Sequence, residues 1–380
     1  RGISVKNEDE LWVATESGLF IYTIENGTFI NLKKSINDPY ALSDNALYCV
    51  TVDNEDGVWI GSYFGGINYY PKQYTQFNKF FPIPGENSIS GNAVREIIKD
   101  RMGNLWIGTE DAGLNKYNPR TGLFTNYAPS ESDQTLSYYN IHALFPKGNK
   151  LWVGTFQHGL DIMDITTGKV IKHYGRGDGH GLSSDFIFSL YEDEFENLFV
   201  VTDSGIQTYD YETDTFTTID AFSEDTHFTA VMRDKDGVLW AGTYWDGLFT
   251  FNPKTKKKRV YRHSTNDRNS ISGNNVNGIF QDSSNRIWIT TEYGLNLYRE
   301  ETTDFKTYTV GDGFPSNVFY SIIEVDDWLW ISTSKGLVEF NPDTEEKRIY
   351  TKANGLLSDQ FNYNSAYKDN NGTLYFGSVA

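Results

Sequence analysis

The residues of this chain that could carry out chemistry do not have the spacing that an active site or a metal centre requires. The six histidines are His142, His158, His173, His180, His227 and His263. No two of them are separated by three residues, as in helical zinc motifs. Cys49 is the single cysteine, so neither a Cys-x-x-Cys pair nor an internal disulfide can form. We therefore expect no metal site and no cofactor.

Carboxylates are abundant, but their positions favour a structural role. The chain has 51 Asp and Glu residues against 33 Lys and Arg residues, which gives a net charge of −18. A glycosidase needs only two carboxyl groups, about 5–10 Å apart. Asp53, Asp100, Asp234 and Asp282, however, recur at regular intervals before a turn, which predicts hydrogen bonds to the turn backbone. We predict no catalytic residues and no enzymatic activity for this chain. Its acidity also argues against contact with nucleic acid.

One short pattern recurs nine times along the chain. It consists of an aliphatic residue, an aromatic residue and a few residues that end in Thr or Ser. The segments are LWVAT from Leu11, VWIGS from Val58, LWIGT from Leu105, LWVGT from Leu151, LFVVT from Leu198, LWAGT from Leu239, IWITT from Ile287, LWIST from Leu329 and LYFGS from Leu374. Their aromatic residues are 41 to 48 residues apart. A regular period of this length indicates a repeat architecture.

Each repeat has the pattern of four short strands joined by tight turns. In residues 94–127 we predict strands at 94–100, 105–109, 114–117 and 123–127, separated by turns rich in Gly, Asn, Asp and Pro. A glycine precedes the third strand of each repeat, where we expect positive φ. These glycines are Gly18, Gly66, Gly113, Gly159, Gly205, Gly247, Gly294 and Gly336. Four-stranded sheets bury both faces when they pack radially, and the recurring Trp would fill the space between neighbours. The predicted fold class is therefore all-β, a β-propeller of four-stranded antiparallel blades.

The repeat resembles the two-component regulator propeller repeat. The resemblance is carried by SGNAVREIIKDRMGNLWIGTEDAGLNKYNPRTGLFTNY and SGNNVNGIFQDSSNRIWITTEYGLNLYREETTDFKTY. It implies the periplasmic sensor region of a hybrid two-component system histidine kinase of Bacteroidetes, which is an inner-membrane protein. It further implies detection of oligosaccharides from polysaccharide breakdown and control of the genes that use them. The full-length receptor would be a histidine kinase and a homodimer.

The resemblance also suggests how the chain is divided, because such sensors commonly contain seven-bladed propellers. Counting back seven repeats from Tyr375 reaches Trp106. We predict that residues 1–92 are the last two blades of a preceding propeller. Residues 93–380 would then form a seven-bladed propeller whose last blade is incomplete. A single ring of eight or nine blades is the alternative.

The turns between the second and third strands carry residues that do not repeat. The candidate ligand-binding residues there are Tyr63, Phe64, Phe156, Gln157, His158, Tyr244, Trp245, Asp246 and Tyr293. Turns have little structural need for Trp or Phe, whereas exposed aromatic rings beside polar groups suit sugar recognition. Packing beneath the long loops between blades is the other interpretation. Two further functions remain open, a secreted glycan hydrolase or lyase on a propeller scaffold and a protein–protein interaction scaffold.

Overall fold

The computed structural model describes residues 1–36, 38, 41–72, 77–132, 134–222 and 226–379. These residues form antiparallel sheets and two short 3-10 helices, η1 (Val310–Asp312) and η2 (Lys352–Asn354). Among them, no helix has the length and apolar character needed to span a bilayer. The chain divides into two compact units, and each is described by itself. The first comprises residues 1–79 and 350–357, and the second comprises residues 80–349 and 358–380.

The first unit contains one four-stranded and one three-stranded sheet. The strands are β1 (Ile3–Val5), β2 (Glu10–Thr15), β3 (Gly18–Thr23), β4 (Thr28–Leu32), β5 (Leu47–Val52), β6 (Val58–Ser62) and β7 (Ile67–Tyr70). Trp12 from the first sheet packs with Val58 and Ile60 from the second in one buried cluster. The two sheets therefore lie face to face, with the recurring Trp between them.

In the second unit, six four-stranded sheets and one two-stranded sheet follow one another along the described chain. The first three sheets consist of β8 (Val94–Lys99), β9 (Leu105–Thr109), β10 (Leu114–Asn118) and β11 (Leu123–Tyr127); β12 (Ile141–Lys147), β13 (Lys150–Thr155), β14 (Leu160–Asp164) and β15 (Val170–Tyr174); and β16 (Ile187–Glu192), β17 (Leu198–Thr202), β18 (Gly205–Asp210) and β19 (Thr215–Thr218). The others consist of β20 (Phe228–Arg233), β21 (Leu239–Thr243), β22 (Leu248–Phe251) and β23 (Lys258–Tyr261); β24 (Val276–Gln281), β25 (Ile287–Thr291), β26 (Leu295–Arg299) and β27 (Asp304–Tyr308); β28 (Phe319–Val325), β29 (Trp328–Thr333), β30 (Gly336–Phe340) and β31 (Lys347–Tyr350); and β32 (Phe361–Lys368) and β33 (Leu374–Ser378). These antiparallel sheets confirm the predicted fold class.

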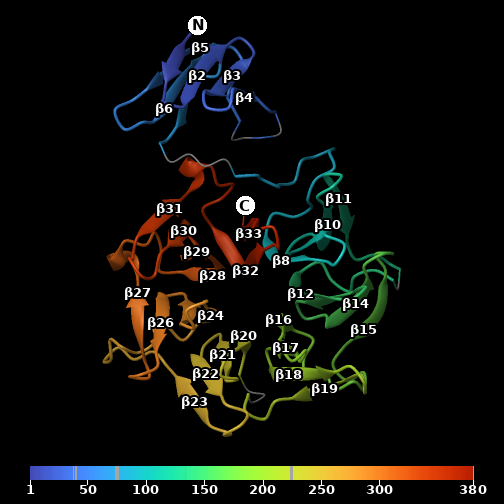
Figure 1. The fold of residues 1–380 in the computed structure, drawn as a ribbon. Helices are drawn as coiled ribbons and strands as arrows, with labels where there is room; N and C mark the ends of the chain where they lie inside the picture. The colour runs from blue at the N-terminus through green and yellow to red at the C-terminus, as the bar shows by residue number, and fades with distance from the viewer. Residues whose placement is uncertain (37, 39–40, 73–76, 133, 223–225, 380) are drawn as a thin grey trace. The chain divides into compact units, whose positions relative to one another are not determined.

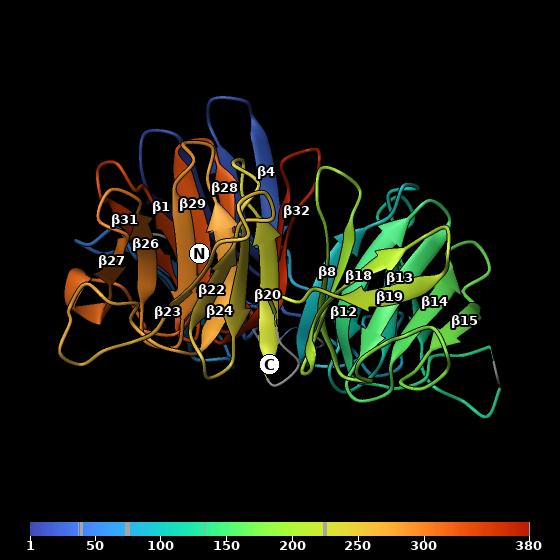
Figure 2. The same cartoon turned by 90° about the horizontal axis from the view of Figure 1, so that it is seen from below.

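The seven sheets of the second unit surround a common axis (Figure 1). The first strands of successive sheets, β8, β12, β16, β20, β24, β28 and β32, each contact the next one, and β32 contacts β8. A β-bridge between Ala93 and Val379 also joins the two ends of the ring. Figure 2 shows these innermost strands from the side, with β20 and β8 standing upright. This unit begins at residue 80, earlier than the boundary at residue 93 that the repeat pattern suggested.

Most of the recurring aromatic residues pack between neighbouring sheets, as predicted, whereas Trp59 of β6 is 43% exposed. Trp106 of β9 is fully buried in a cluster with Leu144 of β12 and Leu151 of β13. Trp288 of β25 packs in the same way with Leu329 of β29. The predicted strands of residues 94–127 match β8 to β11 to within one residue at every end. The repeat therefore builds the blades themselves.

The recurring Asp residues cap the turns between the first and second strands. Asp100 accepts hydrogen bonds from the backbone nitrogens of Met102 and Asn104, each at 2.9 Å, and from Trp106 Nε1 at 2.8 Å. Asp53, Asp234 and Asp282 accept the same type of bond from the Trp six residues later. The prediction of turn capping is confirmed. Each Asp also fixes the position of the indole that packs between blades.

Two blades lack that Trp, and a cation from the adjacent blade replaces its N–H group. Phe199 has no N–H to donate, and Arg233 Nε instead donates to Asp193 Oδ2 at 2.7 Å. In the last sheet, Lys99 Nζ of β8 lies 2.9 Å from Asp369 Oδ2. The carboxylates of both Asp residues are almost fully buried. The second of these ion pairs links the last sheet of the ring to the first.

The turns between the second and third strands are closed by the Thr that ends the recurring pattern. Thr109 Oγ1 donates to the carbonyl oxygen of Gly113 at 2.9 Å, and Thr243 Oγ1 donates to that of Gly247 at 2.8 Å. Seven of the eight predicted turn glycines have positive φ. Gly294 does not, so that prediction is wrong at this position. A Cβ atom on Gly294 would lie 2.8 Å from the Thr307 side chain, so close packing requires the glycine.

Candidate functional site

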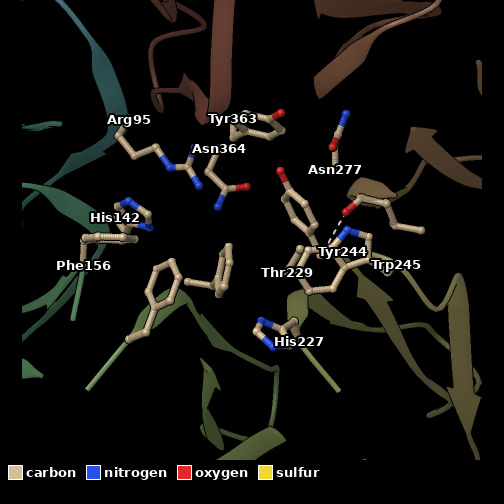
Figure 3. A pocket seen from close by; sticks show the side chains of 13 residues that line it. Arg95, His142, Phe156, His227, Thr229, Tyr244, Trp245, Asn277, Tyr363 and Asn364 are labelled. Carbon is tan, nitrogen blue, oxygen red and sulfur yellow. Dashed lines mark hydrogen bonds between the residues drawn. The ribbon is translucent and has the colours of Figure 1, made fainter. Parts of the chain in front are cut away.

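A pocket of about 440 Å³ opens in the second unit, where the innermost strands begin (Figure 3). It is lined by Arg95, His142, Phe156, Phe186, Phe188, His227, Thr229, Tyr244, Trp245, Val276, Asn277, Tyr363 and Asn364. The volume lies within the range of small-molecule sites, about 300–1,000 Å³. Innermost strands and turns from several sheets contribute to the lining, so the pocket exists only when the ring is assembled.

A register irregularity at the start of six of the seven innermost strands directs side chains into this pocket. In β8, Val94 pairs with Thr109 and Glu96 with Gly108, so Arg95 is the unpaired extra residue. The same irregularity occurs at His142, Phe188, Thr229 and Asn277, which also line the pocket. In β32 it extends over the stretch that contains Tyr363 and Asn364. A bulge redirects the side chain that it carries. This repeated bulge therefore presents a different side chain from six of the seven blades at the mouth of the ring.

Arg95 is the one lining residue with a permanent charge, and its guanidinium group is almost completely buried. Its Nη1 atom lies 3.5 Å from Glu110 Oε1, and its Cζ atom lies 4.8 Å from the centre of the Tyr363 ring. Its Nε atom is buried without a hydrogen-bond partner among the described residues. Burial lowers the pKa of Arg95 below its ordinary value, and it raises the pKa of the neighbouring Glu96 well above its own. The site thus holds a cation whose hydrogen-bonding capacity is incompletely used.

His142 lies beside Arg95 and is surrounded by aromatic rings. Its ring centre is 5.5 Å from that of Phe156, 5.3 Å from that of Phe186 and 6.1 Å from that of Phe188. Burial and, to a smaller extent, the charge of Arg95 lower the pKa of His142 to about 2. The imidazole is therefore neutral at physiological pH. Its Nδ1 atom is a second buried polar atom that lacks a partner among the described residues.

Aromatic side chains form the opposite side of the pocket. The ring of Trp245 lies 4.8 Å from that of Tyr244 and 5.0 Å from that of His227. Trp245 is 58% exposed and Tyr244 is 37% exposed. Figure 3 shows Arg95 and His142 on one side of the space, with Tyr244 and Trp245 across from them. The arrangement combines a polar end with an exposed aromatic wall, which can stack on a flat apolar face.

Three of the nine candidate residues, Phe156, Tyr244 and Trp245, line this pocket. His158, in the same turn as Phe156, stacks instead on Tyr138, with ring centres 3.9 Å apart and planes inclined by 8°. The remaining candidates lie elsewhere. Gln157 has positive φ in its turn, the backbone nitrogen of Asp246 bonds to Thr243 Oγ1, Tyr293 packs over Gly273, and Tyr63 and Phe64 contact each other in the first unit. Their role in binding stays a prediction.

The pocket also contains residues that were not among the candidates, including Arg95, His142, His227, Asn277 and Tyr363. Most of them lie at or next to the second position of an innermost strand. That position follows an apolar residue and differs between repeats, for example Arg95, His142, Phe188, Thr229 and Asn277. This variability was a usable signal. The nine candidate residues all lie in turns, whereas this position lies in a strand.

Comparison with known proteins agrees with the repeat structure. A family model described as "Two component regulator propeller" matches residues 88–111, 223–245 and 270–293. Three segments of this chain therefore match the two-component regulator propeller repeat. The curated protein Histidine kinase P4 from Formosa agariphila is 29% identical to it over 196 residues, which are 52% of this chain and 11% of that protein.

Two solved structures share the repeat fold at low sequence identity. The extracellular domain of a one-component system from B. thetaiotaomicron is 19% identical, with a TM-score of 0.61 over 99% of this chain and 50% of that chain. PorZ, a surface component of the type-IX secretion system of Porphyromonas gingivalis, is 16% identical, with a TM-score of 0.58 over 99% of this chain and 56% of that chain. These similarities establish the fold. The chain spans about half the length of these two structures and a smaller part of the kinase.

Proposed function

We propose that this chain is a ligand-sensing region of a hybrid two-component regulator and that its signal is an oligosaccharide bound in the pocket of the second unit. The observation that carries the proposal is the meeting of turn aromatics with polar side chains from the bulges of several blades. Aromatic rings stack on the C–H faces of sugars, and convergent polar groups bind hydroxyl groups. The family match and the histidine kinase relative support a role in two-component signalling.

The proposed location is the periplasm, as part of an inner-membrane receptor that acts as a homodimer and controls transcription. The B. thetaiotaomicron structure, which is an extracellular domain, supports a location outside the cytoplasm. We also propose that the first unit is the end of a preceding propeller. A ligand that binds one arrangement of propellers or subunits more tightly than another would shift the population toward that arrangement.

A titration of the chain with a panel of oligosaccharides, followed by calorimetry, tests the proposal. Trp245→Ala is expected to weaken binding roughly tenfold, because an aromatic anchor of this kind contributes about 1–2 kcal/mol. Tyr293→Ala is the matched control, since Tyr293 is 60% exposed in an equivalent turn but does not line the pocket. Saccharide binding that is insensitive to Trp245→Ala would place the ligand elsewhere.

The main alternative, a glycan hydrolase, would require a pair of carboxyl groups about 5–10 Å apart. None of the thirteen described lining residues is Asp or Glu, so this pocket does not offer such a pair. Incubation with polysaccharides separates the two functions. Saccharide binding without product formation supports a sensor, whereas release of shortened or unsaturated products would support a hydrolase or a lyase.

A further inference from the structure

We propose that the pocket selects acidic saccharides, with the carboxylate or sulfate group of the sugar bound by Arg95. This inference rests on the proposed function, since it names the class of sugar that the same site would take. The first argument is the contrast in charge. The chain carries a net charge of −18, yet the thirteen described lining residues include Arg95 and no carboxylate. An anion in the pocket meets a cation and no negatively charged lining residue.

The second argument is the unused hydrogen-bonding capacity of Arg95. A guanidinium group has five N–H donors in a fixed fork, and it binds carboxylate or sulfate oxygens with two parallel bonds. The Nε atom of Arg95 has no partner among the described residues. The contact of Nη1 with Glu110 is 3.5 Å long, compared with about 2.7–2.9 Å for a strong charge-assisted bond. An anionic ligand can therefore occupy donors that the protein leaves free.

The third argument is desolvation. A buried donor on a charged group is costly when it lacks an acceptor, and a charged acceptor compensates more fully than a hydroxyl group does. The partnerless Nδ1 atom of His142 lies on the same side of the pocket as Arg95, and this neutral imidazole can share a hydrogen bond with the ligand. A neutral sugar would leave the cation less well compensated, which is the physical basis for selection.

The fourth argument is the position of the aromatic wall. Trp245 and Tyr244 lie across the pocket from Arg95 (Figure 3). A sugar ring stacked on Trp245 can direct a ring substituent toward Arg95. The wall thus supplies stacking for any saccharide, while Arg95 distinguishes acidic from neutral members. The two contributions can be separated by substitution.

The test is calorimetric titration with matched acidic and neutral saccharides. The pairs are digalacturonate and galactobiose, cellobiouronic acid and cellobiose, and sulfated lactose and lactose. At least one acidic member is expected to bind roughly tenfold or more tightly than its neutral partner. The pair that shows the difference identifies a carboxylate or a sulfate as the preferred group. Because a charge-assisted bond is lost, Arg95→Gln should weaken acidic binding roughly tenfold to a hundredfold and abolish the preference.

Arg233→Gln is the matched control, because the Arg233 side chain is only 15% exposed and is paired with a carboxylate but does not line the pocket. It should leave the acidic preference unchanged. If Arg95→Gln does not fold, two measurements remain decisive. Arg95→Lys should retain a weakened preference, and wild-type affinity for the acidic member should fall with added salt while neutral binding does not.

The outcomes distinguish this inference from the function on which it rests. Equal binding of acidic and neutral members, or acidic binding that persists in Arg95→Gln, would overturn the acidic class and leave saccharide sensing intact. Binding of no saccharide in the panel would count against both. A preference that follows Arg95 and weakens with salt supports both.

Discussion

In the third sheet of the second unit, Asp193 accepts from Arg233 the hydrogen bond that a tryptophan N–H donates in other blades. A pair of substitutions can restore the tryptophan arrangement. Asp193 accepts bonds from the backbone nitrogens of Phe195 and Asn197, from the Asn197 side chain and from Arg233 Nε. Asp100 has the equivalent set, with Trp106 Nε1 in place of the arginine. We therefore expect Arg233→Ala to destabilise the protein and Phe199→Trp to restore part of the loss in that background.

The magnitude follows from the burial of Asp193, whose side chain is 0% exposed. Removal of one partner from a buried ion pair costs about 3–5 kcal/mol. The Asp193 oxygens keep three other donors, so we expect about 2–4 kcal/mol for Arg233→Ala. The indole N–H should return about 1–2 kcal/mol, because hydrogen bonds to charged groups contribute about 1.5–3 kcal/mol. Phe199→Trp alone should destabilise, since Arg233 lies 5.8 Å from the Phe199 ring and occupies the space that the indole needs.

The assay is urea unfolding of the wild type, both single variants and the double variant. A coupling free energy of about 2 kcal/mol in favour of the double variant is expected. Additive effects would refute the proposed equivalence of Arg233 and the missing indole N–H.

Burial opposes ionisation of Asp193, but hydrogen bonds from Asn197 and Arg233 outweigh this effect and keep the pKa of Asp193 below its ordinary value. This stabilisation is present above the unfolded pKa of about 3.9 and is lost as the pH falls through the folded pKa. The deficit of Arg233→Ala should therefore shrink below about pH 4.

Three further predictions concern the same ring. Lys99→Met removes the ion pair between the first and last sheets. Because the carboxylate partner of Lys99 is only 3% exposed, the substitution should lower the free energy of unfolding in urea by about 2–3 kcal/mol. A loss under about 0.5 kcal/mol would contradict this role. The hydrogen bond that His173 Nδ1 donates to Asp161 Oδ1 raises the pKa of His173. This pair therefore stabilises the fold below about pH 6.5, and the contribution is lost as the pH rises through the folded pKa. An NMR titration that gives His173 an ordinary or lowered pKa would refute the assignment. Gly247→Ala should lower the melting temperature more than Gly237→Ala does. Both glycines have φ near 84°, but only at Gly247 would a Cβ atom lie 2.1 Å from a carbonyl oxygen. Equal losses would show that φ alone matters.

Much of the fold could be predicted because the repeated residues act locally. The recurring Asp and Trp are six residues apart, and the Asp caps a turn that lies between them. The Thr at the end of the pattern closes the next turn with a bond to a glycine four residues later. These contacts form within a single blade, so their spacing is visible in the chain. Gly294 departs from the pattern because the adjacent side chains of Thr307 and Ser272, rather than its own φ, require the glycine.

The candidate site was only partly predictable, because its residues come from several blades and not from one repeat. The turns that carry Phe156, Tyr244 and Trp245 could be recognised, since large aromatic residues there have no local structural function. The polar side of the pocket comes from bulges in several different strands, and a bulge has no fixed sequence mark. Arg95 and Tyr363 are far apart in the chain and meet because β32 lies beside β8.

The sequence by itself thus determined the blade, because strand periodicity, turn residues and the Asp–Trp spacing depend on neighbours within one repeat. Only the tertiary structure decided which side chains share the pocket, because ring closure brings together residues from the two ends of the second unit. It also decided the chemistry of Arg95 and His142. Their buried and partnerless atoms, and the neutral state of the imidazole, arise from surroundings that several blades supply together.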